Sequence, residues 1–247
     1  MSKVISELVR LIAMVLEVVA ESTSEKAHAK IRAEEAGGEI PSERSVIKYR
    51  PPAEAWDGRV VLQDDPGLVE PVRKWGCFFR SILRHCEIIA DRLLSVEQIN
   101  SIYAECIQGY STLSDKEKKE MRFVMSDKCT MGRNHDEVSA VALRVLGVEG
   151  KRVLQVGAVR NPAPGPLSEY QVSDPSIYWG WVRGTQWQGA DFTVLRGRTK
   201  RIAGHPELGL HFRYGDKRAV EQFDPHSLKP KIIEETAYYL YRVRDVS

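Results

Sequence analysis

The chain has 247 residues, of which 43% are apolar and 28% are charged, a composition that is ordinary for a globular protein and excludes a mainly disordered chain. Its 36 basic and 34 acidic residues leave a formal charge of +2 and are interspersed along the chain. No electrostatic footprint for nucleic acid stands out, so we expect no nucleic-acid partner.

Cysteine usage bears on the cellular compartment and on metal binding. None of the C-x-x-C spacings that mark zinc or redox sites occurs in the chain, and a free cysteine on an apolar helix face packs as a small hydrophobe. We therefore expect a reduced, cytoplasmic protein with no metal site and no cofactor, although the even cysteine count leaves disulfides open. The four cysteines are Cys77, Cys86, Cys106 and Cys129.

Residues 1–35 predict an amphipathic helix. Apolar residues recur at helical spacing from Val4 to Val19, and the other face mixes Glu with Lys and Arg. Such a stripe suits docking on the body of the protein or self-association with a second copy, whereas the mixed charge disfavours a membrane-surface anchor. Charges interrupt the apolar run, so we expect no cleaved signal, and no stretch approaches the about 20 apolar residues of a membrane span.

Glycines and prolines separate this helix from the main domain. Gly37 and Gly38 end the helix, and several prolines punctuate the stretch that follows. Residues 36–70 are therefore predicted to form a linker or extended arm, with a short strand at residues 59–62. The main domain is expected to span residues 71–247.

The first half of this domain is predicted to be helical. Apolar residues at helical spacing from Phe78 to Leu93 predict a helix of about four turns. Capping-box pairs, in which Ser or Asn is followed three residues later by Gln or Glu, open three more helices, the last of which closes at Gly147. The pairs are Ser95 with Gln98, Ser114 with Glu117, and Asn134 with Glu137.

Strand-type segments dominate the second half. Runs rich in β-branched and aromatic residues predict five strands, at residues 153–156, 192–195, 208–214, 220–223 and 238–243. Helices first and strands afterwards predict an α+β domain rather than an alternating parallel-sheet fold.

Cys77 is placed where a thiol can be activated. A thiol is a useful nucleophile only as the thiolate, and the N-terminus of a helix favours the thiolate through unpaired N–H groups and the positive end of the helix dipole. Gly76 permits a tight turn and a close approach of substrate, and Trp75 is positioned to wall a cleft. The backbone N–H of Cys77 is a candidate donor to a developing oxyanion.

A nucleophilic thiol needs a histidine that takes its proton and returns it to the leaving group, and that histidine must be held in orientation. His211 lies on a predicted strand that ends in the turn residues Gly215 and Asp216. The next strand ends at Asp224, so a hairpin would bring this carboxylate back beside His211. The expected triad is Cys77, His211 and Asp224.

A Gly-Cys helix start, a much later strand with His before an aromatic residue, a Gly-Asp turn and a returning strand that ends Asp-Pro together resemble the papain-like cysteine peptidase superfamily. Within it the chain is similar to the bacterial double-glycine-leader (bacteriocin-processing) peptidases, over roughly residues 71–226, and the sequence around Cys77 resembles an uncharacterised family of phage- and plasmid-encoded proteins. The resemblance implies a papain-like fold, in which a helical half with the catalytic cysteine at a helix N-terminus packs on an antiparallel sheet carrying the histidine. It also implies a Cys77 nucleophile, a His211 base and acid, an orienting Asp224, and no cofactor.

One residue of the family pattern is missing. Papain-like enzymes commonly carry a Gln a few residues before the cysteine, which completes the oxyanion hole, but the nearby positions here include Arg73 and Lys74. Gln63 lies farther upstream and would have to fold back, and either basic residue is an alternative source of positive charge. Loss of one oxyanion donor costs about a hundred- to thousandfold in rate.

Other interpretations are open, both for the roles of single residues and for the function of the whole protein. Taken alone, Cys77 and His211 each fit a packed core residue, and the histidines show no i, i+4 pair or carboxylate partner that would support a metal. Trp179 and Trp181 belong to an aromatic cluster that suits either a substrate platform or a core. The sequence thus favours a thiol-dependent hydrolase of a peptide, protein or cell-wall peptide, with a catalytically inactive papain-like scaffold for binding or regulation as the alternative.

Overall fold

Helices come first in the chain and strands follow. The computed structural model describes residues 59–163, 165–173, 189–200, 202 and 205–245. The helices within these residues are α2 (Glu70–Trp75), α3 (Cys77–Ala90), α4 (Val96–Cys106), α5 (Asp115–Lys119), α6 (Asp136–Val145) and α7 (Glu169–Ser173). The predicted α+β class, with its helices before its sheet, is confirmed at this level.

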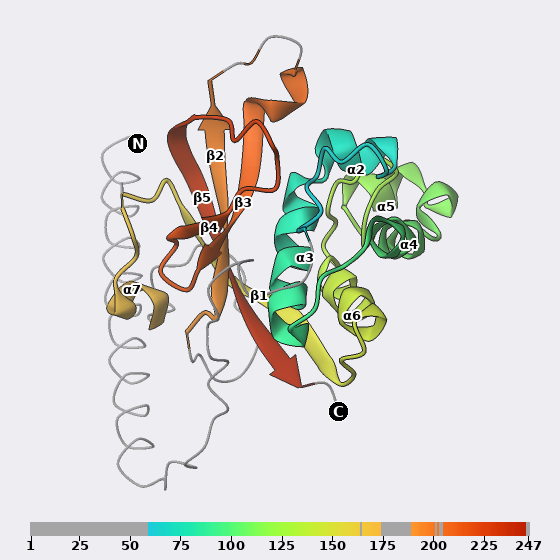
Figure 1. Ribbon diagram of the computed structural model, residues 1–247, viewed down its shortest axis with the longest axis horizontal. Coiled ribbons are helices and arrows are strands. Elements are labelled where there is room, and N and C mark those ends of the chain that lie inside the picture. The colour runs from blue at the N-terminus through green and yellow to red at the C-terminus, as the bar shows by residue number, and fades with distance from the viewer. Residues whose placement is uncertain (1–58, 164, 174–188, 201, 203–204, 246–247) are drawn as a thin grey trace, which may run out of the picture. The chain divides into compact units, whose positions relative to one another are not determined.

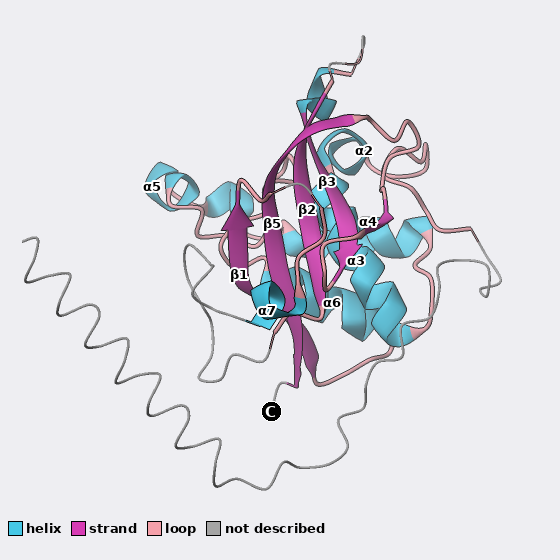
Figure 2. Cartoon of the chain, turned by 90° about the vertical axis from the view of Figure 1, so that its left-hand side faces the viewer, coloured by secondary structure: helices cyan, strands magenta, loops and turns pink. Residues whose placement is uncertain are grey.

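The strands form one antiparallel sheet in the order β1-β5-β2-β3-β4. In chain order they are β1 (Lys151–Arg160), β2 (Phe192–Thr199), β3 (Leu210–Asp216), β4 (Glu221–Phe223) and β5 (Ile232–Asp245). The helices α3 and α6 pack on one side of the sheet and α7 lies on the other (Figures 1 and 2). Within the described residues, no helix is long and apolar enough to cross a membrane.

Alternation along the strands supplies a core on each side of the sheet. On one face of the sheet, Val194 and other buried residues pack with the helices. On the opposite face, Leu195 and other buried residues pack with the segment around α7. Neighbouring residues of β2 therefore belong to different cores, as the two-residue period of a strand requires. The helix-side core includes Phe79, Ile82, Val138, Val194 and Tyr214, and the opposite core includes Val156, Leu167, Val172, Leu195 and Leu240.

Two local predictions are wrong. Residues 59–62 form no strand, because the Val61 carbonyl accepts hydrogen bonds from the Arg80 guanidinium, at 3.1 Å from Nε and 2.8 Å from Nη2, rather than from a neighbouring strand. Asn134 does not cap α6, whose N-cap residue is His135 and has no side-chain capping bond. The capping boxes at Ser95 and Ser114 both form with their two reciprocal bonds.

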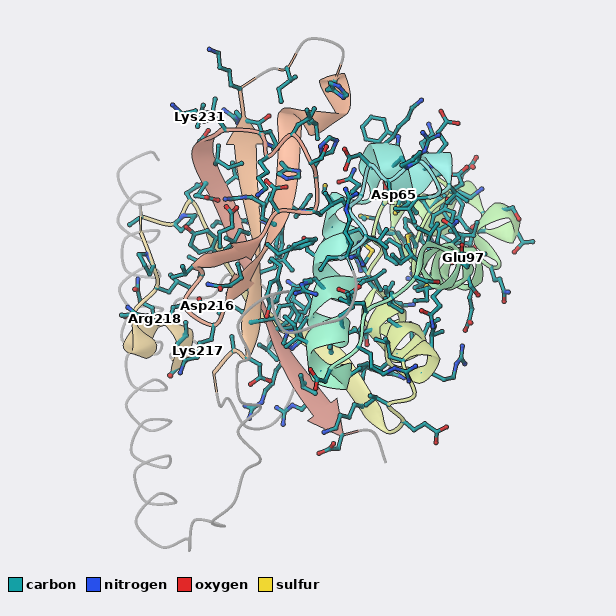
Figure 3. All side chains as sticks on the ribbon, viewed as in Figure 1. Asp65, Glu97, Asp216, Lys217, Arg218 and Lys231 are labelled. Carbon is teal, nitrogen blue, oxygen red and sulfur yellow. The ribbon has the colours of Figure 1, made fainter. Side chains whose placement is uncertain are left out.

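The turn between β3 and β4 is tied to the segment before α7. Oδ1 of Asp216 accepts the N–H of Arg218 at 2.8 Å and the N–H of Val220 at 2.9 Å. The Arg218 carbonyl in turn accepts the N–H of Leu167 at 2.7 Å, and Figure 3 shows Asp216 and Arg218 beside α7. These bonds fix the closed end of the hairpin, so that its open end is a rigid place for functional side chains.

Candidate functional site

The junction between α2 and α3 presents Cys77 as the first residue of α3. Gly76 separates the two helices, and its N–H donates to the Val72 carbonyl at 2.8 Å. A Cβ on residue 76 would lie 2.4 Å from that carbonyl oxygen, closer than non-bonded atoms approach. A φ of −82° is open to any residue, so the backbone conformation does not call for glycine at position 76. The close packing against Val72 does.

Gly76→Ala is expected to lower the free energy of unfolding by about 1 to 3 kcal/mol, because the added methyl group overpacks the helix junction. Urea denaturation measures this loss. Gly209→Ala is the matched control, since a Cβ there meets nothing within 4 Å and should change stability by no more than about 1 kcal/mol. Equal losses in the two variants would contradict the role given to Gly76.

His211 and Asp224 lie side by side at the open end of the β3–β4 hairpin. Nε2–H of His211 donates to Oδ1 of Asp224 at 2.7 Å, and the exposed fractions of the two residues are 0% and 8%. The backbone N–H of His226 donates to the same oxygen at 2.9 Å. Because Nε2 carries the proton of this bond, Nδ1 is the ring nitrogen left for a second partner.

The Cys77 thiol is the candidate for that partner. Phe78 and Phe212, which directly follow Cys77 and His211 in the chain, stack with ring centroids 4.7 Å apart and planes 7° from parallel. The thiol interacts with the imidazole of His211, while Nδ1 is buried and makes no close hydrogen bond to a described residue.

Opposing effects act on the pKa of His211. Burial lowers this pKa, but the hydrogen bond to Asp224 and the influence of Cys77 raise it, and the net result is a pKa raised to about 9. An imidazole with this pKa keeps its proton across the neutral range. His211 is therefore a cation held between two groups that carry or can carry negative charge.

Cys77→Ala is expected to lower the pKa of His211 from about 9 by about one pH unit or more, because an opposite charge close to the ring favours the charged imidazolium. An NMR titration of the imidazole nitrogens measures the change. Cys106→Ala, which removes a buried thiol elsewhere, should leave this pKa where it is.

The same pKa predicts a pH dependence of stability. The folded-state pKa of about 9 lies above the ordinary 6.5, so the stabilisation is fully present below pH 6.5 and is lost as the pH rises through 9. Cys77→Ala should lose less stability than the unmodified protein between these two pH values. If the NMR titration gave the same His211 pKa in Cys77→Ala as in the unmodified protein, the Cys77 thiol would not reach the ring.

The arm before α2 folds back onto the site. Gln63 is fully buried; its N–H donates to the Pro225 carbonyl, next to Asp224, at 2.6 Å, and its Nε2 donates to the Arg73 carbonyl at 3.0 Å. In an unbroken helix the Arg73 carbonyl would pair with the N–H of Cys77. Gln63 thus contacts the backbone on both sides of the site, next to the carboxylate and just before the cysteine.

A buried charge cluster in α3 holds this arm. Arg80 donates to the Val61 carbonyl and lies 3.4 Å from Glu87, which also binds Arg84 at 3.0 Å. All three side chains are at most 2% exposed. Sequence reasoning missed this cluster, although three charges at spacing i, i+4 and i+7 on an otherwise apolar helix were a usable signal.

The remaining cysteines and His85 are packed residues. Cys86, Cys106 and Cys129 are free and buried, and burial raises the pKa of each thiol, for Cys106 to about 12. His85 stacks on Phe192 with centroids 3.7 Å apart, and burial lowers the pKa of His85 to about 3. None of these groups has the partners that surround Cys77.

Other expectations are only partly covered by the described residues. Trp75 is 45% exposed beside Gly76, and its expected role as a cleft wall stays a prediction. Trp179, Trp181 and residues 1–58 lie outside the described residues. No group of three or more His, Cys, Asp or Glu side chains that could hold a metal ion occurs in the described part of the chain.

Comparison with known proteins adds no relative. The chain matches no protein-family model, no curated protein and no solved structure. The functional argument therefore rests on the geometry of Cys77, His211 and Asp224.

Proposed function

We propose that the protein is a thiol-dependent hydrolase that cleaves peptide or amide bonds through an acyl-enzyme. The observation that carries the proposal is the position of His211: it is fully buried, its Nε2–H donates to Asp224, and Asp224 and Cys77 together raise its pKa to about 9. A structural histidine has no need of both an orienting carboxylate and a thiol at a helix start. Activated cysteines are found in such surroundings.

The chemistry follows from these positions. The proton of the pair resides on His211, and Sγ of Cys77 attacks the substrate carbonyl carbon as the thiolate. His211 then gives its proton to the leaving nitrogen as the C–N bond breaks, which leaves an acyl group on Sγ. Water, deprotonated by Nδ1, attacks this thioester and releases the acid and the thiolate. Asp224 keeps the ring in one tautomer and supports its charge throughout.

The oxyanion is held by the start of α3. The N–H of Cys77 is the first in that helix, where N–H groups lack helical acceptors and the dipole is positive. Gln63 is a positioning residue rather than the missing oxyanion donor, because its Nε2 donates to the Arg73 carbonyl and ties it to the arm. This assignment includes the papain-like fold, which the cysteine at the start of α3 and the histidine on β3 support.

A catalytically inactive scaffold is the second candidate, and burial favours it. Cys77 is only 8% exposed and His211 is not exposed at all, so a bulky substrate reaches the thiol only after side chains move. A scaffold that binds a partner on its surface has no need of an accessible Cys77.

Reaction with p-nitrophenyl acetate tests the hydrolase directly, because this ester is small enough for a confined site. We expect a burst of p-nitrophenol, an acetyl group on Cys77 by mass spectrometry, and loss of that group as water regenerates the thiol. Cys77→Ala should abolish the burst and Cys106→Ala should retain it. If Cys77 is acetylated no faster than Cys106 in the folded protein, the hydrolase is excluded and the scaffold stands.

A further inference from the structure

A pocket of about 470 Å³ lies beside the triad, between the end of α2 and the loop that follows β4. Arg73 and Lys74 line it from α2, only a few residues before Cys77. His226, Ser227 and Leu228 line it from the loop, directly after Asp224 and Pro225. The pocket is therefore framed by the segments that carry the nucleophile and the orienting carboxylate.

Direct contacts couple the pocket wall to the triad. The N–H of His226 donates to Oδ1 of Asp224, and the rings of His226 and His211 lie at a centroid distance of 6.5 Å, close to perpendicular. Gln63 spans the same wall, from the Pro225 carbonyl to the Arg73 carbonyl. A group bound in the pocket would sit one side chain away from His211.

The groups that the pocket offers to a ligand are mostly cations and donors. Arg73 forms no ion pair within 4 Å among the described residues and reaches Glu70 only at longer range, while Lys74 pairs with Glu70 on the surface at 2.5 Å. Nδ1 of His226 accepts the N–H of Leu228 at 3.2 Å, so its proton is on Nε2, a donor.

The one carboxylate in the lining is already engaged. Oδ1 of Asp64 accepts the N–H of Ser227 at 3.2 Å, and Oδ2 accepts the hydroxyl of the same residue. Asp64 therefore holds the loop in place rather than standing free for a positively charged ligand.

We propose that this pocket binds a carboxylate of the substrate and that the substrates are acidic peptides. The proposal rests on the proposed hydrolase. Arg73 is the principal recognition residue, because a guanidinium matches a carboxylate with two parallel hydrogen bonds. Leu228, which is 48% exposed, supplies an apolar contact for the carbon chain that carries the acid.

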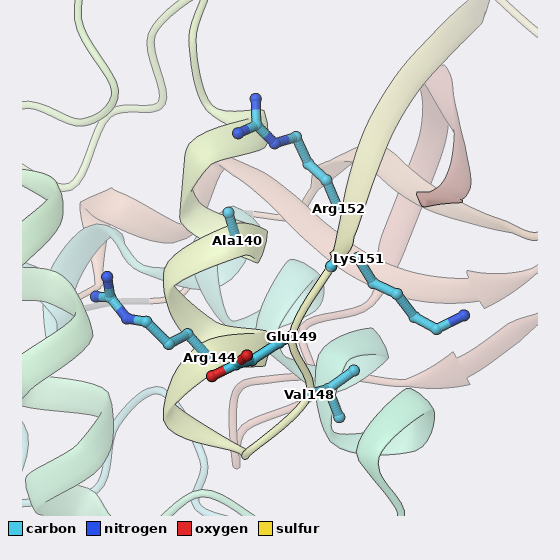
Figure 4. A pocket seen from close by; sticks show the side chains of 7 residues that line it. Ala140, Arg144, Val148, Glu149, Lys151 and Arg152 are labelled. Atoms are coloured by element: carbon cyan, nitrogen blue, oxygen red, sulfur yellow. The ribbon is translucent and has the colours of Figure 1, made fainter. Parts of the chain in front are cut away.

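A second pocket lies near the start of β1, and Arg144, Lys151 and Arg152 are among its lining residues (Figure 4). Its volume is about 300 Å³, and its three cations have partners within the described residues. Arg144 binds Glu105 at 2.6 Å, Lys151 binds Asp245 at 3.3 Å, and Arg152 binds Glu137 at 2.8 Å. Arg144 is consequently a matched control for Arg73.

Paired alkylating reagents test the carboxylate pocket. N-iodoacetyl derivatives of glycine, β-alanine and 6-aminohexanoate place a carboxylate at three distances from the reacting carbon, and their carboxamides are the neutral counterparts. In each reaction Sγ of Cys77 forms a bond to the methylene carbon and iodide leaves. Rates at Cys77 are read by mass spectrometry, and glutathione gives the intrinsic carboxylate-to-carboxamide ratio.

At one spacer length we expect the carboxylate-to-carboxamide ratio at Cys77 to exceed that of glutathione by about tenfold or more, which corresponds to one charged hydrogen-bond pair. Arg73→Gln should return the ratio to the glutathione value, and Arg144→Gln should leave it high. A ratio equal to that of glutathione at every spacer, with Cys77 still faster than Cys106, overturns the carboxylate pocket and leaves the hydrolase standing.

Binding without reaction separates the remaining cases. N-acetyl-6-aminohexanoate, compared with its amide, should shift the NMR signals of the Arg73 guanidinium in the unmodified protein. If Cys77 is unreactive and this carboxylate-specific shift is present, the pocket binds carboxylates, but the assignment of acidic peptide substrates is overturned together with the hydrolase. If neither reactivity nor a carboxylate-specific shift is seen, both proposals are overturned.

Discussion

His211→Gln is expected to lower the rate at which iodoacetamide alkylates Cys77 at pH 6 by about 100-fold or more. An ordinary thiol titrates near 8.5, so only about 0.3% of it is ionised at pH 6. The pKa of His211 is raised to about 9, so the imidazolium supplies a positive charge that favours a neighbouring thiolate. Glutamine keeps the size of the side chain and a donor for Asp224, but it supplies neither the charge nor the proton acceptor.

The measurement is site-resolved alkylation from pH 4 to 9, read by mass spectrometry. Cys106 is the internal reference, because burial raises the pKa of its thiol to about 12 and its rate should be equally slow in both proteins. Circular dichroism checks that the variant is folded. Equal rates at Cys77 in the two proteins, or a Cys77 rate no higher than that of Cys106, would mean that no activated pair exists.

Glu87→Gln is expected to lower the free energy of unfolding by about 3 to 5 kcal/mol, which is the loss seen when a buried charge is stripped of its partner. The carboxylate of Glu87 is the counter-charge of Arg80 and Arg84 inside the protein, with side-chain exposures of 0% for Glu87 and Arg80 and 2% for Arg84. Its Oε1 also accepts the N–H of Leu94 at 3.3 Å. The variant removes the negative charge that these two buried guanidinium groups share.

Urea denaturation again provides the measurement, with Glu105→Gln as the matched control. Glu105 pairs with Arg144 at 2.6 Å, but these side chains are 39% and 60% exposed, and exposed pairs contribute about 1 kcal/mol or less. A loss in Glu87→Gln as small as that in Glu105→Gln would show that the cluster is solvated in solution and does not hold the arm.

The periodic segments of the fold were predictable because burial imposes periodicity directly. The capping boxes at Ser95 and Ser114 begin α4 and α5 as expected, since both bonds of each box are local. The lengths of β1, β2 and β5 were underestimated. β5 runs from Ile232 to Asp245, because pairing on both sides extends it through charged residues that lack a strand signature. Tertiary contact, rather than local preference, decides those ends.

In the candidate site too, local features were predictable from the sequence and tertiary contacts were not. The pairing of His211 with Asp224 follows from one hairpin, so turn chemistry and strand alternation were enough to expect it. The return of Gln63 depends on contacts with Pro225 and Arg73, which only the packed structure creates. The Arg80 cluster went unnoticed because charges on a helix are ordinarily solvent-facing, and its buried position depends on the carbonyl that the arm supplies.

The sheet order also governs when the molecule can assemble during synthesis. β1 and β2 follow one another among the strands, but they never touch: β5 lies between them, and its pairing with β1 joins residues as far apart as Lys151 and Asp245. Such long-range pairing is slow and must wait until residues 232–245 have left the ribosome. The hairpin that carries His211 and Asp224 is synthesised before β5, but the complete sheet to which this hairpin belongs forms only after β5. A chain still under translation therefore lacks the complete five-stranded sheet until its last strand emerges.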